Sequence, residues 1–103
     1  MLQVRVISII SLVWDEWNVA HIDRHNVLKG EVEEVCKGTY FVLDGYKDRL
    51  IIIGPTRFKR VLAIDPEPEE GIYYVVTARV ADKKERKLYE KVKGGGKKDD
   101  KTV

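Results

Sequence analysis

Three short runs of apolar, mostly β-branched residues constrain the fold of this chain most. They are Tyr40–Leu43, Leu50–Ile53 and Val61–Ile64. Turn-forming pairs separate them: Asp44-Gly45 follows the first run and Gly54-Pro55 follows the second. Short apolar runs joined by such turns are typical of strands that pair antiparallel with their neighbours in the chain. The runs therefore predict an antiparallel meander.

A fourth strand is predicted over Ile72–Val80, which completes a four-stranded antiparallel sheet. The acidic, proline-containing segment Asp65–Gly71 before it predicts an exposed turn. Because side chains alternate along a strand, one face should be wholly apolar and buried, and the other should end in a threonine and an arginine. The first face comprises Tyr74, Val76, Ala78 and Val80, and the second comprises Tyr73, Val75, Thr77 and Arg79.

Before this sheet, the sequence predicts a strand over Gln3–Val13 and two helices. Asp15 occupies an N-cap position, so a helix should run from Glu16 to about His25, with Asn26 in the left-handed conformation that ends it. A second helix should run from Leu28 to Lys37 and close at Gly38. Its buried stripe would be Leu28, Val32, Val35 and Cys36.

A third helix is predicted after the last strand. Asp82 is its N-cap, and Glu85 completes a capping box. Residues 94–103, GGGKKDDKTV, predict a flexible basic tail. The expected architecture is a single α+β domain over residues 1–93, and the side chains that should pack on its core from this helix are Ala81, Leu88, Tyr89 and Val92.

Composition excludes several classes of protein. The chain has 103 residues, a net charge of +2 and one cysteine, so it is one domain without an intrachain disulfide. The run Val4–Val13 is too short to span a membrane and lacks the basic start of a signal peptide, which predicts a cytoplasmic protein without a membrane partner. Basic residues are concentrated in Thr56–Arg60 and in Lys83–Lys101. They could form an RNA-binding surface, or they could simply be the solvated face of a helix.

Two histidines and two tryptophans are further candidates for chemistry. His21 and His25 have the i, i+4 spacing of metal ligands, but no third ligand is evident, so we predict no metal and no cofactor. His25 could transfer protons, bind phosphate or merely cap its helix. Trp14 and Trp17 could stack on bases, but beside apolar strands tryptophan is more often a core residue.

Arginines at strand ends are the strongest candidates. Arg49 and Arg60 begin two strands and Arg79 ends the next, so Arg60 and Arg79 could meet at one edge of the sheet. With Arg57 and Lys59 they would form a cluster of cations suited to a phosphodiester. The alternative is that they are charges that protect exposed strand edges.

Two blocks of the sequence resemble the two signatures of the BrnT family of bacterial and archaeal toxins. WDEWNVAHIDRHNV (Trp14–Val27) resembles the first, a Trp-Asp start followed by a short helix and a basic-His-Gly-Val end. VVTARVADKKERKLYE (Val75–Glu90) resembles the second, a Ser/Thr-Ala-Arg strand end followed by a helix with Glu-Arg and tyrosine. The resemblance spans about residues 14–90, with Asn26 in place of the family's glycine.

This resemblance implies a RelE-like fold and a metal-independent ribonuclease, neutralised by a small cognate antitoxin. The implied reaction is attack of an RNA 2′-hydroxyl on the adjacent phosphate. By position, Arg79 and His25 match family residues, as do Glu85 and Tyr89, while Arg60 and Arg49 are looser assignments. The expected catalytic residues are therefore Arg79, Arg60, His25 and Arg49, and the expected RNA-binding residues are Arg57, Lys59, Lys84 and Lys87.

Two other functions fit the sequence. One is a non-catalytic module, either a degenerate toxin or an adaptor, that holds RNA or an acidic partner. The other is a scaffold whose apolar surfaces serve assembly alone. The RNA target, ribosome dependence and oligomeric state, including a dimer formed through the antitoxin, do not follow from the sequence.

Overall fold

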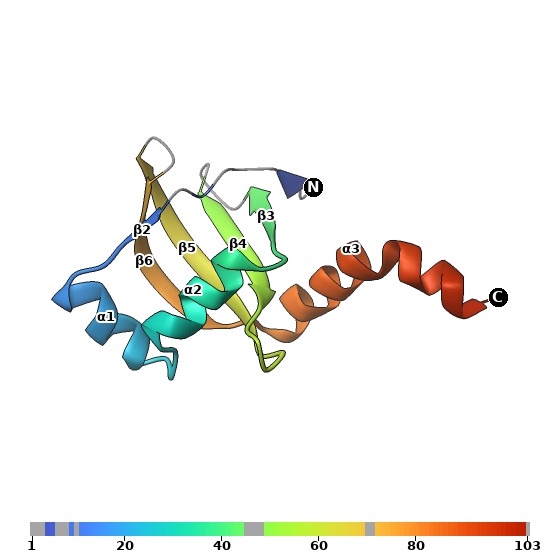
Figure 1. The fold of residues 1–103 in the computed structure, drawn as a ribbon, viewed down its shortest axis with the longest axis horizontal. Helices are drawn as coiled ribbons and strands as arrows, with labels where there is room; N and C mark the ends of the chain where they lie inside the picture. Colours follow the sequence, from blue (N-terminus) through green and yellow to red (C-terminus); the bar gives the residue numbers. More distant parts are fainter. Residues whose placement is uncertain (1–3, 6–8, 10, 45–48, 70–71, 103) are drawn as a thin grey trace.

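The computed structural model describes residues 4–5, 9, 11–44, 49–69 and 72–102. These residues form an α+β fold, the predicted class, in which α1 and α2 lie over the sheet and α3 extends away from it (Figure 1). In chain order the elements are β1 (Val4–Arg5), β2 (Ser11–Val13), α1 (Glu16–Asp23), α2 (Lys29–Lys37), β3 (Phe41–Asp44), β4 (Leu50–Pro55), β5 (Val61–Glu69), β6 (Ile72–Val80) and α3 (Lys83–Thr102).

The described strands form one mixed sheet in the order β1-β3-β4-β5-β6-β2. β3 to β6 pair antiparallel in succession, so the predicted meander is present. β2 lies parallel to β6, and β1 lies antiparallel to β3. The predicted sheet of four antiparallel strands is therefore corrected to a six-stranded mixed sheet. The predicted turn at Gly45 lies outside the described residues.

The single strand predicted over Gln3–Val13 is wrong. Its described parts are β1 and β2, which pair with opposite edges of the sheet. One straight strand cannot reach both edges, because four other strands lie between them. Residues 3, 6–8 and 10 of the predicted strand lie outside the described residues.

The predicted start of α1 and the predicted end of α2 are confirmed, whereas α1 ends at Asp23, before the predicted His25, and α2 begins at Lys29, one residue after the predicted Leu28. The Asp15 carboxylate accepts a hydrogen bond from the Asn18 amide at 2.8 Å, and the Asn18 side chain accepts one from the Asp15 amide at 2.8 Å. Asn26 has φ 61°, the left-handed conformation expected after α1. Gly38 is the C-cap of α2. These ends depend on local hydrogen bonds, which a short sequence pattern encodes.

β5 continues through most of the segment that was predicted to be a turn. Its residues up to Glu69 pair with β6, whereas its pairing with β4 stops at Ile64. Beyond Ile64 one side of β5 is thus unpaired in the described residues. Proline has no N–H to donate, so it is tolerated in a strand where one side has no pairing partner, and Pro66 and Pro68 both lie in this stretch.

The regular alternation predicted for β6 is wrong. The pairing between β5 and β6 shifts at Asp65/Pro66, so one extra β6 residue lies between Val75 and Thr77. Tyr73, Val75 and Ala78 are buried, whereas Val80 is 42% exposed. The bulge places Val75, and with it Tyr73, on the same face of the sheet as Ala78. The face of Tyr74, Val76, Ala78 and Val80 that alternation predicts is therefore not formed.

The sheet has an apolar cluster on each face. On the face covered by α1 and α2, here called the helical face, the strand residues are Val42, Ile52, Leu62, Ile64 and Ala78, and the helix residues are Ile22, Val32 and Val35. On the opposite face, here called the α3 face, the cluster is Phe41, Leu43, Ile53, Ala63, Ala81 and Tyr89. Cys36 packs partly buried against the helical-face cluster, as predicted.

Some residues predicted to pack on the core are exposed. Leu28 is 61% exposed and Val92 is 41% exposed, in contrast to Ala81 and Tyr89, which are buried as predicted. Trp14 packs against the helical-face cluster and donates from Nε1 to Glu33 at 2.9 Å. Trp17 is 58% exposed, so the core assignment is wrong for this tryptophan.

The backbone of α3 continues to Thr102, past the triple glycine at which the sequence predicts the helix to end. Each glycine costs a helix about 1 kcal/mol relative to alanine, which is the basis of the tail predicted over residues 94–103. The predicted cap of α3 is confirmed: Asp82 Oδ1 accepts from the Glu85 amide at 2.8 Å, and Glu85 Oε1 accepts from the Asp82 amide at 2.9 Å.

Candidate active site on the α3 face of the sheet

Two of the predicted arginines meet at an aspartate on the α3 face. Arg49, at the start of β4, places Nη2 3.1 Å from Oδ2 of Asp65. Asp65 lies on β5 opposite Thr77, and Arg79 lies two residues further along β6, opposite Ala63. Asp65 and Arg79 are thus diagonal neighbours on one face of the sheet, and the backbones of such residues lie about 7–8 Å apart. Their charged side chains interact electrostatically. The three strands β4, β5 and β6 thus bring together Arg49, Asp65 and Arg79.

Arg79 is held by a carboxylate of α3. Its Nη1 and Nη2 donate to the two oxygens of Glu85 at 2.7 and 2.8 Å. This bidentate contact raises the pKa of Arg79, whose side chain is 42% exposed. Two of the five guanidinium N–H groups are used in this way, so three remain for a ligand. Glu85 therefore orients Arg79 without saturating it.

Asp65 has an unusual environment for a carboxylate. Its side chain is 26% exposed, and its Oδ1 is buried with no hydrogen-bond partner among the described residues. Burial raises the pKa of Asp65, and the nearby Arg49 opposes that effect only in part. A carboxylate with a raised pKa accepts a proton more readily, which is the property required of a general base. Arg49 and Arg79, on either side of Asp65, would hold a phosphate next to this carboxylate.

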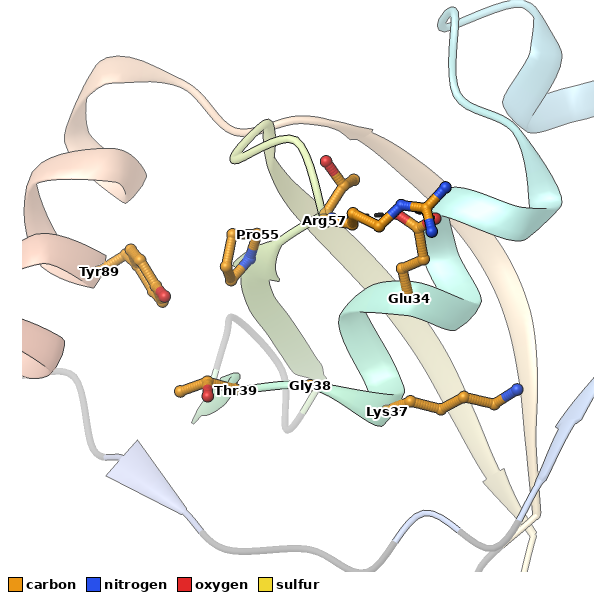
Figure 2. Close-up of a pocket in the computed structure, with 8 residues that line it drawn as sticks. Glu34, Lys37, Gly38, Thr39, Pro55, Arg57 and Tyr89 are labelled. Carbon is orange, nitrogen blue, oxygen red and sulfur yellow. Dashed lines mark hydrogen bonds and ion pairs between the residues drawn. The ribbon is translucent and has the colours of Figure 1, made fainter.

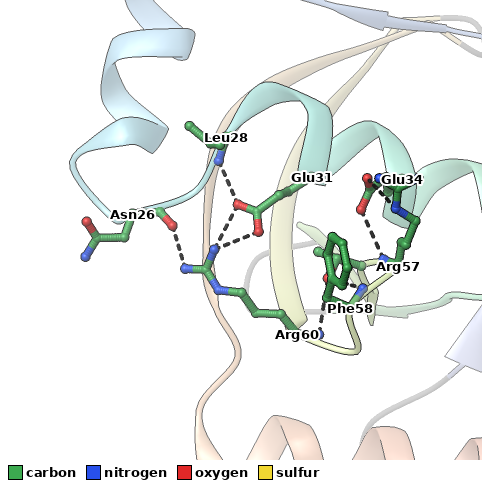
Figure 3. A network of polar contacts seen from close by, with 8 residues as sticks. Asn26, Leu28, Glu31, Glu34, Arg57, Phe58 and Arg60 are labelled. Atoms are coloured by element: carbon green, nitrogen blue, oxygen red, sulfur yellow. Dashed lines mark hydrogen bonds and ion pairs between the residues drawn. The ribbon is translucent and has the colours of Figure 1, made fainter.

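Arg60 lies on the helical face and is not brought together with Arg79. Its Nη1 donates to both oxygens of Glu31 at 2.8 Å, and its Nη2 donates to the carbonyl oxygen of Asn26 (Figure 3). Arg60 is three residues from Ala63, an odd separation along a strand, so the two side chains point to opposite faces. Arg60 instead joins the start of β5 to α2 and to the link between α1 and α2.

The predicted RNA-binding residues Arg57 and Lys59 lie in the β4–β5 turn. The guanidinium carbon of Arg57 lies 5.2 Å from the centre of the Phe58 ring, and Phe58 is 80% exposed. The backbone N–H of Arg57 donates to Glu34 at 3.0 Å (Figure 3). Lys59 is exposed with φ 67°. The buried Thr56 organises this turn, because its hydroxyl accepts from the backbone of Phe58 and of Arg60.

His25 is exposed in the turn that follows α1. Its ring lies edge-on to His21 at 5.3 Å, and His21 stacks on Trp17 at 4.8 Å. The described residues contain no group of three or more side chains that could hold a metal ion. Asn18 is spaced three and seven residues before the two histidines, as on one side of a helix. Its side chain is buried and donates to the carbonyl oxygen of Val13 at 2.9 Å, so its role is structural.

Lys84 and Lys87 are exposed on the first turns of α3. These turns begin beside Arg79, because Glu85 lies between the two lysines in sequence and contacts Arg79. The two predicted RNA-binding lysines therefore belong to the same helix end as the α3-face site.

A cleft of about 440 Å³ lies beside the β4–β5 turn, between the end of α2, the end of β4 and α3. Figure 2 shows Tyr89 of α3 and Pro55 of β4 across the opening from Lys37 and Thr39. The other lining residues are Glu34, Gly38, Thr56 and Arg57. Smaller hollows lie beside α1 and beside Cys36.

Asp65 is the site residue that the sequence interpretation missed. Glu31, the partner of Arg60 on the helical face, was also not singled out. Asp65 was assigned to an exposed turn because two prolines follow it within three residues. One signal could have found it: Asp65 directly follows the apolar run Val61–Ile64 and has the same parity as Ala63. A carboxylate in strand register beside two arginines is a candidate for chemistry.

Comparison with known proteins identified no match for this chain among family models, curated proteins or solved structures. In the part of the chain that the structure describes, no helix is long and apolar enough to cross a membrane.

Proposed function

We propose that this protein is a metal-independent ribonuclease related to the BrnT toxins, with its active site at Arg49, Asp65 and Arg79. The observation that carries the proposal is Asp65, a half-buried carboxyl with a raised pKa between two arginines on the α3 face. A base and two fixed cations are what cleavage by a 2′-hydroxyl requires.

In the proposed reaction, Asp65 accepts the proton of the RNA 2′-hydroxyl. The 2′-oxygen then forms a bond to phosphorus, and the bond from phosphorus to the 5′-oxygen breaks. The 5′-oxygen takes a proton from water, and the upstream product carries a 2′,3′-cyclic phosphate. Arg49 and Arg79 stabilise the negative charge that develops on the phosphoryl oxygens, while Glu85 positions Arg79.

The remaining features of the toxin class belong to the same proposal. The antiparallel strands β3 to β6 and the closing helix α3 support a RelE-like arrangement, to which β2 adds a parallel strand. The two blocks that resemble the BrnT signatures contact each other, because Val27 and Val75 share one core cluster. A small cognate antitoxin and action on cytoplasmic RNA follow from the class. Arg60 and His25, on the helical side, have no part in the proposed reaction.

The test is RNA cleavage in EDTA. Wild-type protein should produce 2′,3′-cyclic phosphate ends, and a 2′-deoxy substitution at the cleaved nucleotide should block the cut. Asp65→Asn should lower the rate by about 10²–10⁴ fold, the usual contribution of a general base. Asp23→Asn, on the exposed surface of α1, is the matched control and should keep full activity. Equal rates for Asp65→Asn and wild type would refute the assignment.

One observation favours a second function, a non-catalytic RNA-binding module. Arg79 already has two short bonds to Glu85, as expected of a purely structural ion pair. RNA binding that weakens steeply with salt, without cleavage products from wild-type protein, would favour this second function.

A further inference from the structure

We propose that the cleft formed by Lys37, Thr39, Pro55, Arg57 and Tyr89 is a second nucleotide-binding subsite, which holds a flanking nucleotide of the RNA (Figure 2). This inference rests on the proposed ribonuclease function. It differs from that function in the residues involved, because none of these five side chains belongs to the reacting group around Asp65.

The cations of the cleft are loosely held, in contrast to Arg60 and Arg79. Arg57 Nε lies 3.9 Å from Glu34, and Lys37 Nζ lies 4.0 Å from Glu33. The side chains of Lys37 and Arg57 are 80% and 73% exposed. Exposed pairs at such distances contribute little to stability, so a phosphate can replace these contacts.

Arg60 and Arg79 form the comparison. Both make charge-assisted bonds of 2.7–2.8 Å to a carboxylate that is itself mostly buried. Rearranging either pair would leave a poorly solvated carboxylate without its partner. Arg57 and Lys37 are therefore better placed than Arg60 to move toward an incoming phosphate.

The carboxylate of the cleft is already partly neutralised. Glu34 accepts a hydrogen bond from the Arg57 backbone N–H at 3.0 Å as well as facing its guanidinium. Lys37, in the last turn of α2, offsets the negative end of that helix. The lining contains two cations and one carboxylate, and Figure 2 shows Lys37 extending away from Tyr89, so the positive charge available to a phosphate lies at the outer edge of the cleft.

The size and the remaining lining suit a nucleotide. A volume of about 440 Å³ falls in the usual range of small-molecule sites. Pro55 and the small exposed edge of Tyr89, which is only 4% exposed, provide apolar surface for a base or sugar, and the Thr39 hydroxyl provides a hydrogen-bonding group. The rim binds phosphate and the interior accepts the less polar part of the same ligand.

The position of the cleft relative to Asp65 suits a flanking nucleotide. Pro55 pairs with Val61, which lies four residues along β5 from Asp65. With about 3.3 Å per residue along a strand and about 4.8 Å between strands, Pro55 and Asp65 are separated by about 14 Å. That distance is too long for one phosphate to contact both sites, so the cleft would bind a different nucleotide of the same strand.

The probe is adenosine 5′-monophosphate, followed through the backbone amide signals of Gly38 and Thr39 by NMR. We expect saturable shifts of both signals with wild-type protein and with Asp65→Asn. The double variant Lys37→Ala/Arg57→Ala should weaken binding roughly tenfold or more, since it removes two charged donors. Lys83→Ala, an exposed lysine at the start of α3, is the control and should leave the affinity unchanged.

RNA cleavage provides the second readout and separates bound RNA from free mononucleotide. With a long single-stranded RNA, the double variant should raise KM about tenfold with kcat unchanged, as expected for lost binding of a flanking nucleotide. An unchanged KM would overturn the subsite even if the mononucleotide binds. Absence of shifts at Gly38 and Thr39 would overturn it as well. Nucleotide binding by Asp65→Asn separates failure of the subsite from failure of the ribonuclease proposal.

Discussion

Asp65 combines partial burial with two cationic neighbours, and this combination makes it a candidate base. Its pKa is raised above the ordinary value of 3.8, first because burial disfavours the charged form, while Arg49 acts in the opposite direction. We therefore expect ribonuclease activity to increase with pH as Asp65 ionises, with a midpoint above 3.8. The pH dependence of kcat/KM checks this expectation, and a rise whose midpoint lies at or below pH 3.8 would contradict it.

The same shift predicts how Asp65 affects folding. Because the pKa is higher in the folded than in the unfolded protein, the folded state is favoured below the unfolded pKa and loses that advantage as pH rises through the folded pKa. At pH 7 the ionised Asp65 should thus reduce stability. Asp65→Asn should melt at the same or a higher temperature than wild type at pH 7, and the difference should shrink near pH 3, below the ordinary 3.8. A lower melting temperature at pH 7 would show that the contact with Arg49 dominates.

At the scale of elements, the bulge in β6 determines which side chains are buried. Val75 is fully buried in the same cluster as Ala78, three residues away, which regular alternation does not allow. Val80, the last residue of β6, is 42% exposed. Val75→Ala should therefore lower the free energy of unfolding by about 2 kcal/mol, whereas Val80→Ala should change it by less than about 0.5 kcal/mol. Urea denaturation of the two variants measures both values. A cost for Val75→Ala as small as that for Val80→Ala would indicate that Val75 is not buried and would contradict the bulged register.

The N-caps of α1 and α3 and the left-handed residue after α1 were the features best predicted from sequence. The caps at Asp15 and Asp82 and the left-handed Asn26 involve residues within a few positions of one another, so the local pattern contains the interaction. The extent of strands was predicted less well. β5 passes through two prolines because β4 no longer pairs with it there, and that condition depends on a distant segment.

At the scale of the whole molecule, α3 has two parts. The described contacts of this helix with the core come from Leu88 and Tyr89, together with Ala81 just before it. The later part extends away from the sheet (Figure 1). Deletion of residues 94–103 should therefore leave the melting temperature within about 2 °C of the full chain, since surface changes away from the core rarely exceed 0.5 kcal/mol. Calorimetry checks this, and a large decrease would show that these residues stabilise the body.

Local propensity and short turns were enough to predict the α+β class, the caps at Asp15 and Asp82 and the four consecutive antiparallel strands. The sequence also identified the arginines as candidates, but not which of them meet. Tertiary structure alone decided that Arg49 and Arg79 share one face with Asp65, while Arg60 lies on the other. The physical reason is strand register: a shift of one residue reverses the face of a side chain, and register depends on pairing between segments distant in the chain.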